Sequence, residues 1–164
     1  MIIEERVERS QYVKLITWIV SFIILMAGIV FPVLILWVNQ DMMSKVIGAS
    51  VLCLIFFTLI FTVAYQPRKL ILSETHIIME RILGQVYISY SDITDISLYH
   101  RENVAEIRIF GIGGLGGYIG KFYNSKIGFY TAYVGDYSQA FLIKINNREK
   151  YVMSCRHAEK IVEE

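Results

Sequence analysis

Two long apolar segments dominate the first third of the chain. Residues 15–38 and 46–65 contain no Asp, Glu, Lys, Arg or His. A bilayer core of roughly 30 Å requires about 20 helical residues, and both segments reach that length. A core helix of a soluble protein shows a polar stripe every three or four positions, and neither segment has one. The pattern predicts a transmembrane helical hairpin over residues 15–65, with spans at 15–38 and 46–65.

Aromatic and basic residues at the ends of these segments fit insertion. Indole rings and positive charges favour the bilayer interface, and basic residues favour the cytoplasmic side. Basic residues flank the hairpin, whereas the connecting turn holds only Lys45. We therefore expect an integral membrane protein with both termini in the cytoplasm. A cleaved signal peptide is the competing interpretation of the first segment, but its apolar run is too long. The predicted interface residues are Trp18, Trp37, Tyr65, Arg68 and Lys69.

The first 14 residues mix acidic and basic side chains. Such a segment is typical of a solvated, charged cytoplasmic arm, and we expect this arm at residues 1–14. A short interfacial helix is the alternative.

After Pro67 the pattern changes to a period of two, rich in β-branched and aromatic residues. Short runs of this kind alternate with turn residues up to residue 154, and residues 156–164 show helical spacing. The pattern predicts a mainly-β, α+β domain over 68–164, with seven or eight antiparallel strands curled into a barrel and a C-terminal helix capping it. In residues 105–110, we expect Ile107 and Ile109 on the buried face, opposite Glu106 and Arg108.

Composition narrows the partner classes. The chain has a net charge of +1, without the basic excess typical of nucleic-acid binding, so we expect no nucleic-acid partner. Its two cysteines, Cys53 in the second span and Cys155 near the end, are too far apart to form a disulfide framework.

Residues 90–96 (YSDITDI), residues 150–154 (KYVMS) and the final helix resemble the bacterial pleckstrin-homology-like (PH-like) family. The arrangement is similar to small membrane proteins in which two amino-terminal spans precede such a domain. The resemblance implies a non-catalytic binding or scaffolding module on the inner face of a bacterial membrane. One departure concerns the ligand: the turn at residues 73–75 holds one acidic residue and no basic one, which argues against binding of inositol phosphates.

The glycine-rich run at residues 111–120 contains G-x-G-x-x-G at Gly111, Gly113 and Gly116. A dinucleotide site requires a helix directly after these glycines, and residues 121–131 have strand or loop character instead. We therefore expect no nucleotide and no other cofactor here, and a mobile or bulged loop is the simplest interpretation.

The same region is dense in aromatic residues and cations, which suit an interfacial contact. We hypothesise that residues 111–130 contact membrane lipids or an unidentified membrane or cytoplasmic protein, a second copy of the chain included. The candidate contact residues are Gly113, Gly114, Gly116, Gly117, Tyr118, Lys121, Phe122, Tyr123 and Lys126.

No spacing of His, Cys, Asp or Glu predicts a metal site or a catalytic group. Three functional classes remain. The favoured one is a membrane-anchored module that docks a protein partner or its own copies. The second is a lipid-sensing or envelope-stress component. The third, a small transporter or enzyme subunit, is disfavoured because the spans hold no charge that provides an ion path.

Overall fold

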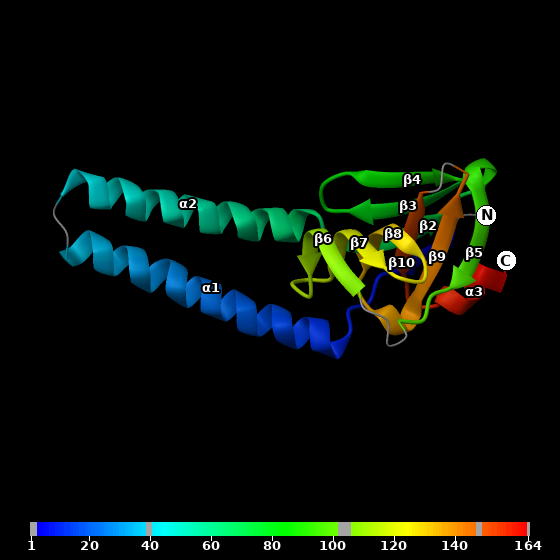
Figure 1. Ribbon diagram of the computed structural model, residues 1–164, viewed down its shortest axis with the longest axis horizontal. Coiled ribbons are helices and arrows are strands. Elements are labelled where there is room, and N and C mark those ends of the chain that lie inside the picture. Colours follow the sequence, from blue (N-terminus) through cyan, green and yellow to red (C-terminus); the bar gives the residue numbers. More distant parts are fainter. Residues whose placement is uncertain (1–2, 39–40, 102–105, 147–148, 164) are drawn as a thin grey trace.

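The computed structural model describes residues 3–38, 41–101, 106–146 and 149–163. A pair of antiparallel helices extends from one end of a β domain (Figure 1). These helices are α1 (Gln11–Val38) and α2 (Met42–Ala64). They confirm the predicted order of helices followed by a mainly-β domain, although each begins about a turn before its apolar segment.

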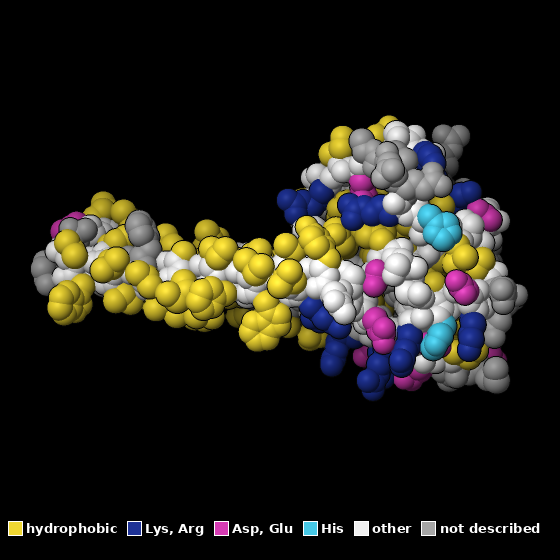
Figure 2. Space-filling view, turned by 90° about the horizontal axis from the view of Figure 1, so that it is seen from below, with side chains coloured by type: hydrophobic (Ala, Val, Ile, Leu, Met, Phe, Trp, Pro, Cys, Tyr) yellow, Lys and Arg dark blue, Asp and Glu magenta, His cyan; other side chains and the backbone are white. Residues whose placement is uncertain are grey.

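Both helices are long and apolar enough to cross a membrane. Only 12% and 11% of the residues in their most apolar windows are buried. The helices contact each other closely at Gly28, where an added Cβ would lie 2.8 Å from Cδ1 of Ile55. Figure 2 shows hydrophobic side chains along the visible face of the helices, and Lys and Arg side chains where the helices meet the domain.

The first sheet has the strand order β1-β2-β3-β4, in which β1 (Ile3–Arg6) pairs antiparallel with β2 (Pro67–Leu72). The hairpin partners β3 (His76–Arg81) and β4 (Gln85–Ser89) complete it. The prediction of a solvated arm was therefore wrong for residues 3–6. Ile3 lies opposite Leu72 and packs against the main core, and the charged residues 4–6 complete a strand that covers the edge of β2.

The second sheet has the order β5-β9-β10-β8-β7-β6. Its strands are β5 (Ile93–Leu98), β6 (Glu106–Gly113), β7 (Tyr118–Asn124), β8 (Gly128–Val134), β9 (Ala140–Ile145) and β10 (Lys150–Ser154). The β10–β8 pair is parallel and the other pairs are antiparallel. Nine of the ten described strands, β2 to β10, lie in the predicted domain, so the expected count of seven or eight was too low, and they form two sheets in place of the expected single barrel.

The main core lies between the two sheets and the terminal helix α3 (Ala158–Glu163). Phe141, Ile143 and Met153 of the second sheet join Leu70 and Ile77 of the first sheet in this core, and all five are fully buried. A second cluster lies on the opposite face of the second sheet, where Tyr99, Phe122 and Tyr130 are buried. Two short 3₁₀ segments, Tyr90–Asp92 and Tyr137–Gln139, precede β5 and β9.

Candidate functional site

The glycine-rich run forms a β-hairpin whose turn, residues 114–117, packs against the helices. The Gly116 amide donates a hydrogen bond of 2.7 Å to Oγ1 of Thr17 on α1. Gly114, Gly116 and Gly117 are all buried. The prediction of a mobile or bulged loop was therefore wrong, because the turn is fixed by the protein's own α1.

Glycine is required at the centre of this turn for two reasons. Gly116 has a φ of +74°, and an added Cβ would lie 1.9 Å from Nε2 of Gln66. Gln66 follows α2, is 6% exposed, and accepts a 2.6 Å hydrogen bond from Nη2 of Arg9. We call Arg9, Thr17, Gln66 and Gly116 the junction, because they join both helices to the domain.

Strand β7 follows the glycines directly, in place of the helix that a dinucleotide site requires. Each glycine of the G-x-G-x-x-G pattern lies in the β6–β7 hairpin. The pattern therefore serves a tight strand connection, and β7 has the strand character expected after these glycines.

Strand β6 does not bury the face that the sequence predicted: its residues from Ile107 to Gly111 are exposed on both faces. The side chain of Glu106 is 4% exposed, whereas Ile107 and Ile109 are each 55% exposed and Phe110 is 73% exposed. A register shift between Arg108 and Phe110 places Ile109 outside the regular pairing with β7. Because β6 is the last strand of its sheet, this apolar surface lies at an open edge.

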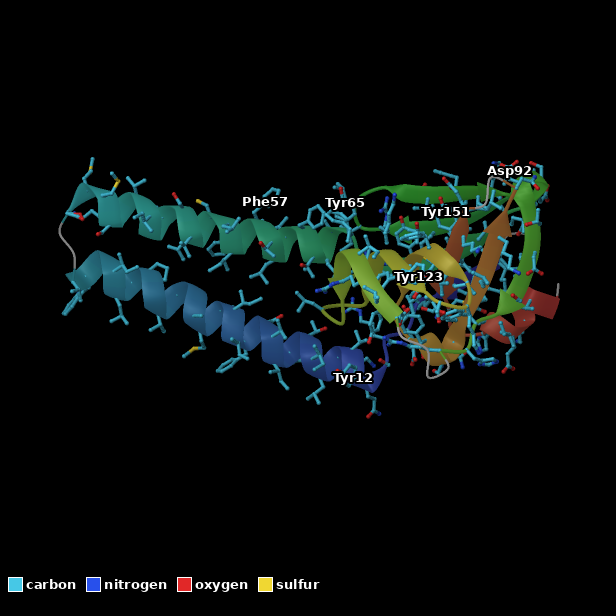
Figure 3. The ribbon with its side chains drawn as sticks, viewed as in Figure 1. Tyr12, Phe57, Tyr65, Asp92, Tyr123 and Tyr151 are labelled. Carbon is cyan, nitrogen blue, oxygen red and sulfur yellow. The ribbon has the colours of Figure 1, made fainter. Side chains whose placement is uncertain are left out.

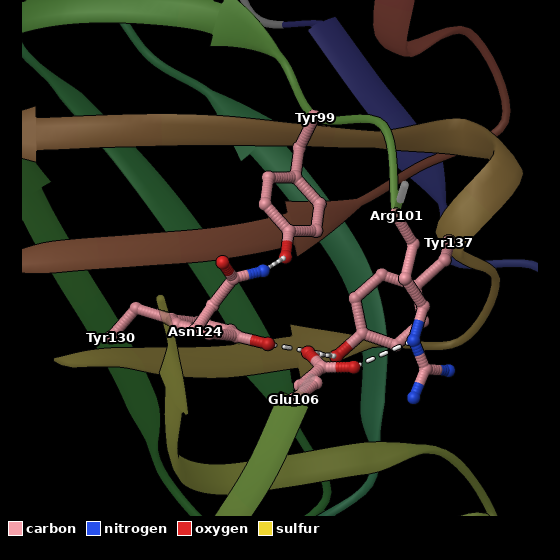
Figure 4. Close-up of polar contacts among 6 residues, drawn as sticks. All are labelled: Tyr99, Arg101, Glu106, Asn124, Tyr130 and Tyr137. Atoms are coloured by element: carbon pink, nitrogen blue, oxygen red, sulfur yellow. Dashed lines mark hydrogen bonds and ion pairs between the residues drawn. The ribbon is translucent and has the colours of Figure 1, made fainter. Parts of the chain in front are cut away.

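Two neighbours hold the Glu106 carboxylate, one through an ion pair and one through a hydrogen bond (Figure 4). Nε of Arg101 lies 2.6 Å from Oε2, and Oη of Tyr137 donates a 3.0 Å hydrogen bond to Oε1. Burial and the nearby carboxylate raise the pKa of Tyr137 above its ordinary value, so the phenol remains a donor. The arrangement holds the start of β6 inward and thereby orients the exposed residues that follow.

Aromatic rings surround this ion pair. The Arg101 guanidinium carbon lies 4.6 Å from the ring centroid of Tyr137 and 5.1 Å from that of Tyr118. Nearby, Nδ2 of Asn124 donates a 3.0 Å hydrogen bond to the Tyr99 hydroxyl. Burial, followed by the Glu106 charge, raises the pKa of Tyr99. These contacts form a rigid base beneath the exposed face of β6.

An open groove of about 470 Å³ crosses strands β6, β7, β8 and β10. Its walls include apolar side chains, Ile109 and Phe129, and the ammonium group of Lys121. Within the part of the chain that the structure describes, the Lys121 side chain forms no ion pair or hydrogen bond. Tyr151 closes one side, and its hydroxyl donates to Oε2 of Glu149 at 3.0 Å. The groove therefore combines apolar surface with an available cation.

The structure divides the predicted contact residues into three groups. Lys121 lies in the groove, and Tyr123, labelled in Figure 3, packs edge-to-face with Phe129 at a centroid distance of 5.0 Å. Phe122 is buried and is unable to reach a partner. The remaining ones are Gly113 at the end of β6, Gly114, Gly116 and Gly117 in the packed turn, Tyr118 beside Arg101, and Lys126 in the β7–β8 turn.

The predicted membrane-interface residues lie at both ends of the helix pair. Trp18 and Trp37 are 77% and 84% exposed on α1. Tyr65 caps the end of α2, where its ring lies 5.3 Å from the Arg81 guanidinium carbon (Figure 3). The last two, Arg68 and Lys69, lie in β2, where Lys69 pairs with Glu4 at 3.1 Å.

Sequence reasoning missed Ile107, Ile109 and Phe110 as surface residues. Alternation shows that the two faces of a strand differ, but it does not show which face is buried. A signal was present in the adjacent apolar pair Ile109-Phe110, which breaks the alternation and marks the bulge.

Reactive groups are sparse near the groove. The described residues contain no group of three or more His, Cys, Asp or Glu positioned to hold a metal. Cys155 is buried against the core, and burial raises its pKa to about 12, so the thiol is unreactive at neutral pH. The site has the features of a binding surface.

Two sheets with a terminal helix and an open groove define a small binding or scaffolding domain. A comparison with known protein families matches residues 68–164 to the Bacterial PH domain family. Because the match covers more than half of the chain, the protein belongs to that family. PH domains are generally non-catalytic binding modules, and no catalytic family is indicated. Neither the curated proteins nor the solved structures contain a match.

Proposed function

We propose that this protein is a membrane-anchored, non-catalytic binding module whose PH domain docks a protein partner at the cytoplasmic face of a bacterial inner membrane. The observation that carries the proposal is the edge strand β6, in which the Glu106 side chain points inward and three apolar side chains, Ile107, Ile109 and Phe110, are exposed. Exposed apolar surface at an open sheet edge is characteristic of interaction sites.

The helix pair supplies the anchor. Apolar side chains surround both helices, and burial within the protein accounts for little of them, so a hydrocarbon environment explains their composition. Trp18 and Trp37 lie near opposite ends of α1, as expected if one indole occupies each interface of the bilayer. The positive charges of Arg68 and Lys69, next to the end of α2, favour a cytoplasmic position of the domain.

The groove defines the chemistry of the partner. Ile109, Phe110 and Phe129 favour an apolar segment, and Lys121 favours a carboxylate on that segment. The lipid-sensing alternative requires the glycine turn to be free to contact the bilayer. Thr17 and Gln66 already contact that turn, so it is not available to lipid. A protein partner uses the face of β6 to β8 that remains open.

Photocrosslinking in native membranes tests this proposal. A photoreactive benzophenone amino acid replaces Phe110 in the full-length chain, and the control carries it at Tyr87, which is 61% exposed on the other sheet. We expect a discrete protein adduct from position 110 that Lys121→Glu abolishes, and none from position 87. An adduct of twice the chain mass identifies a second copy. Labelling of lipid alone from position 110 contradicts the proposal.

A further inference from the structure

The tight turn between β3 and β4 carries two exposed apolar residues at its tip. The Arg81 amide donates to the Gly84 carbonyl at 3.2 Å, and Gly84 has a φ of +80°. Ile82 and Leu83 form the tip and are 52% and 58% exposed. Turn tips favour Gly, Asn, Asp, Ser and Pro, so two large aliphatic side chains here require an explanation.

This turn is bonded to the end of α2. The Leu83 amide donates a 2.8 Å hydrogen bond to the carbonyl of Ala64, the last residue of the helix. It thereby satisfies a carbonyl that the helix itself leaves without a partner. Figure 1 shows the β3–β4 turn beside the domain-side end of α2. The apolar tip is therefore at the level where the helix leaves the domain.

The turns at the opposite ends of the same strands are polar. Ser73, Glu74 and Thr75 connect β2 to β3, at the far end of β3 from Leu83, and six residues of strand separate the two ends by roughly 17 Å. The second sheet shows the same division, with Leu115 in the turn beside α1 and Ser125 in the turn away from it. The polarity of the turns thus follows their position relative to the helices.

We propose that Ile82 and Leu83 insert into the interfacial zone of the phospholipid bilayer, beside the point where α2 leaves it. This inference rests on the proposed function, because it requires α2 to cross the membrane. A bilayer is the occupant that the geometry favours, since Ala64 and Leu83 share one level and the apolar surface of α2 continues into the turn.

Insertion gives the domain a third attachment to the membrane. The junction already holds the glycine turn against α1 and Gln66. With the β3–β4 turn in the interface, the domain does not rotate about Gln66-Pro67, and the β6 groove has a fixed orientation relative to the membrane plane. The groove then presents the same face to every partner at the membrane surface.

Nitroxide labels on the full-length chain test the inference in vesicles of phosphatidylethanolamine and phosphatidylglycerol. The background is Cys53→Ser, in which Cys155 is buried, and this parent is carried through labelling as a blank. Single cysteines are Leu83→Cys, the matched turn control Ser125→Cys, and the α2 reporter Leu54→Cys. Accessibility to oxygen, which partitions into lipid, is compared with accessibility to a water-soluble nickel complex.

We expect the oxygen-to-nickel ratio to be about ten-fold higher at position 83 than at position 125, because oxygen concentrates in the apolar zone and the nickel complex stays in water. A ratio at position 83 equal to that at position 125, with a lipid-like ratio at position 54, overturns this inference alone. A water-like ratio at position 54 overturns both this inference and the proposed membrane anchor.

Discussion

At the scale of single residues, glycines with the same backbone conformation have different roles. Gly116 and Gly128 have φ values of +74° and +78°. A Cβ at Gly116 would overlap Gln66, whereas a Cβ at Gly128 would have one neighbour, Nζ of Lys150, at 3.9 Å. A comparison of substitutions at the two glycines therefore separates two costs. One is the cost of the left-handed conformation, and the other is the cost of the lost contact with Gln66.

We predict that Gly116→Ala destabilises the protein more than Gly128→Ala. Both variants lose about 1 kcal/mol from the left-handed conformation. Gly116→Ala loses roughly 2 kcal/mol more, because the new methyl group overlaps a buried side chain. Thermal unfolding in detergent micelles, followed by circular dichroism, measures the difference. Equal shifts for the two variants show that the turn is not packed on Gln66.

The Glu106 carboxylate gives a second prediction. Glu106→Gln leaves Arg101 without its counterion and lowers the free energy of unfolding by roughly 2 kcal/mol. The matched control is Asp95→Asn, since Asp95 and Lys144 form an exposed pair at 2.8 Å and contribute less than about 1 kcal/mol. Denaturant titration compares the two variants. A larger loss for Asp95→Asn than for Glu106→Gln contradicts the inward orientation of the Glu106 side chain.

Because Cys155 is buried, we predict that the free energy of unfolding depends on pH in the alkaline range. Burial raises its pKa from 9.0 to about 12 in the folded protein. Below pH 9 both states hold the proton and the stability is fully present; above pH 9 the unfolded chain releases it first, so stability falls until pH 12. Urea unfolding at pH 8, 9 and 10 should show this decline, and Cys155→Ala should reduce its slope. An unchanged slope in the variant assigns the decline to other groups.

At the scale of elements, sequence patterns located most strands but left two out. Alternation of apolar and polar residues marked β2 to β6 and β8 to β10, because the period of two survives wherever one face is buried. Strand β1 was missed because charged residues dominate its composition, and β7 because glycines beside it suggested a loop. Strand β1 depends on pairing with β2, which is distant in sequence, and β7 depends on pairing with its neighbour β6. Local composition does not encode such pairing.

Because β1 pairs with β2, we predict that β1 protects the amides of β2 from hydrogen exchange. Ile3→Ser removes an apolar side chain that packs against the main core and weakens β1, at a cost of roughly 1 kcal/mol. Amides of residues 70–72 should then exchange hydrogen faster. Glu4→Gln, on the exposed side of β1, serves as the control and should leave exchange unchanged. Equal protection in both variants shows that β1 contributes no cover to β2.

At the scale of the whole molecule, the helices and the domain form one connected unit. Sequence alone identified the hairpin, the domain class and two groove-side residues, Lys121 and Tyr123. It did not identify the junction, because Arg9, Thr17, Gln66 and Gly116 are distant in sequence and none is unusual by itself. The same limit applies to the groove, which requires the register of β6 against β7 and β8.

In the proposed arrangement, a membrane hairpin holds this PH domain at the cytoplasmic face. Cysteines at Asp41, in the turn between the helices, and at Ser125, in the domain, test it directly in a Cys53→Ser background. A membrane-impermeant maleimide should label position 41 in spheroplasts and position 125 only in inverted membrane vesicles. Labelling of both positions from the same side, or recovery of the chain in the soluble fraction without detergent, would contradict the account.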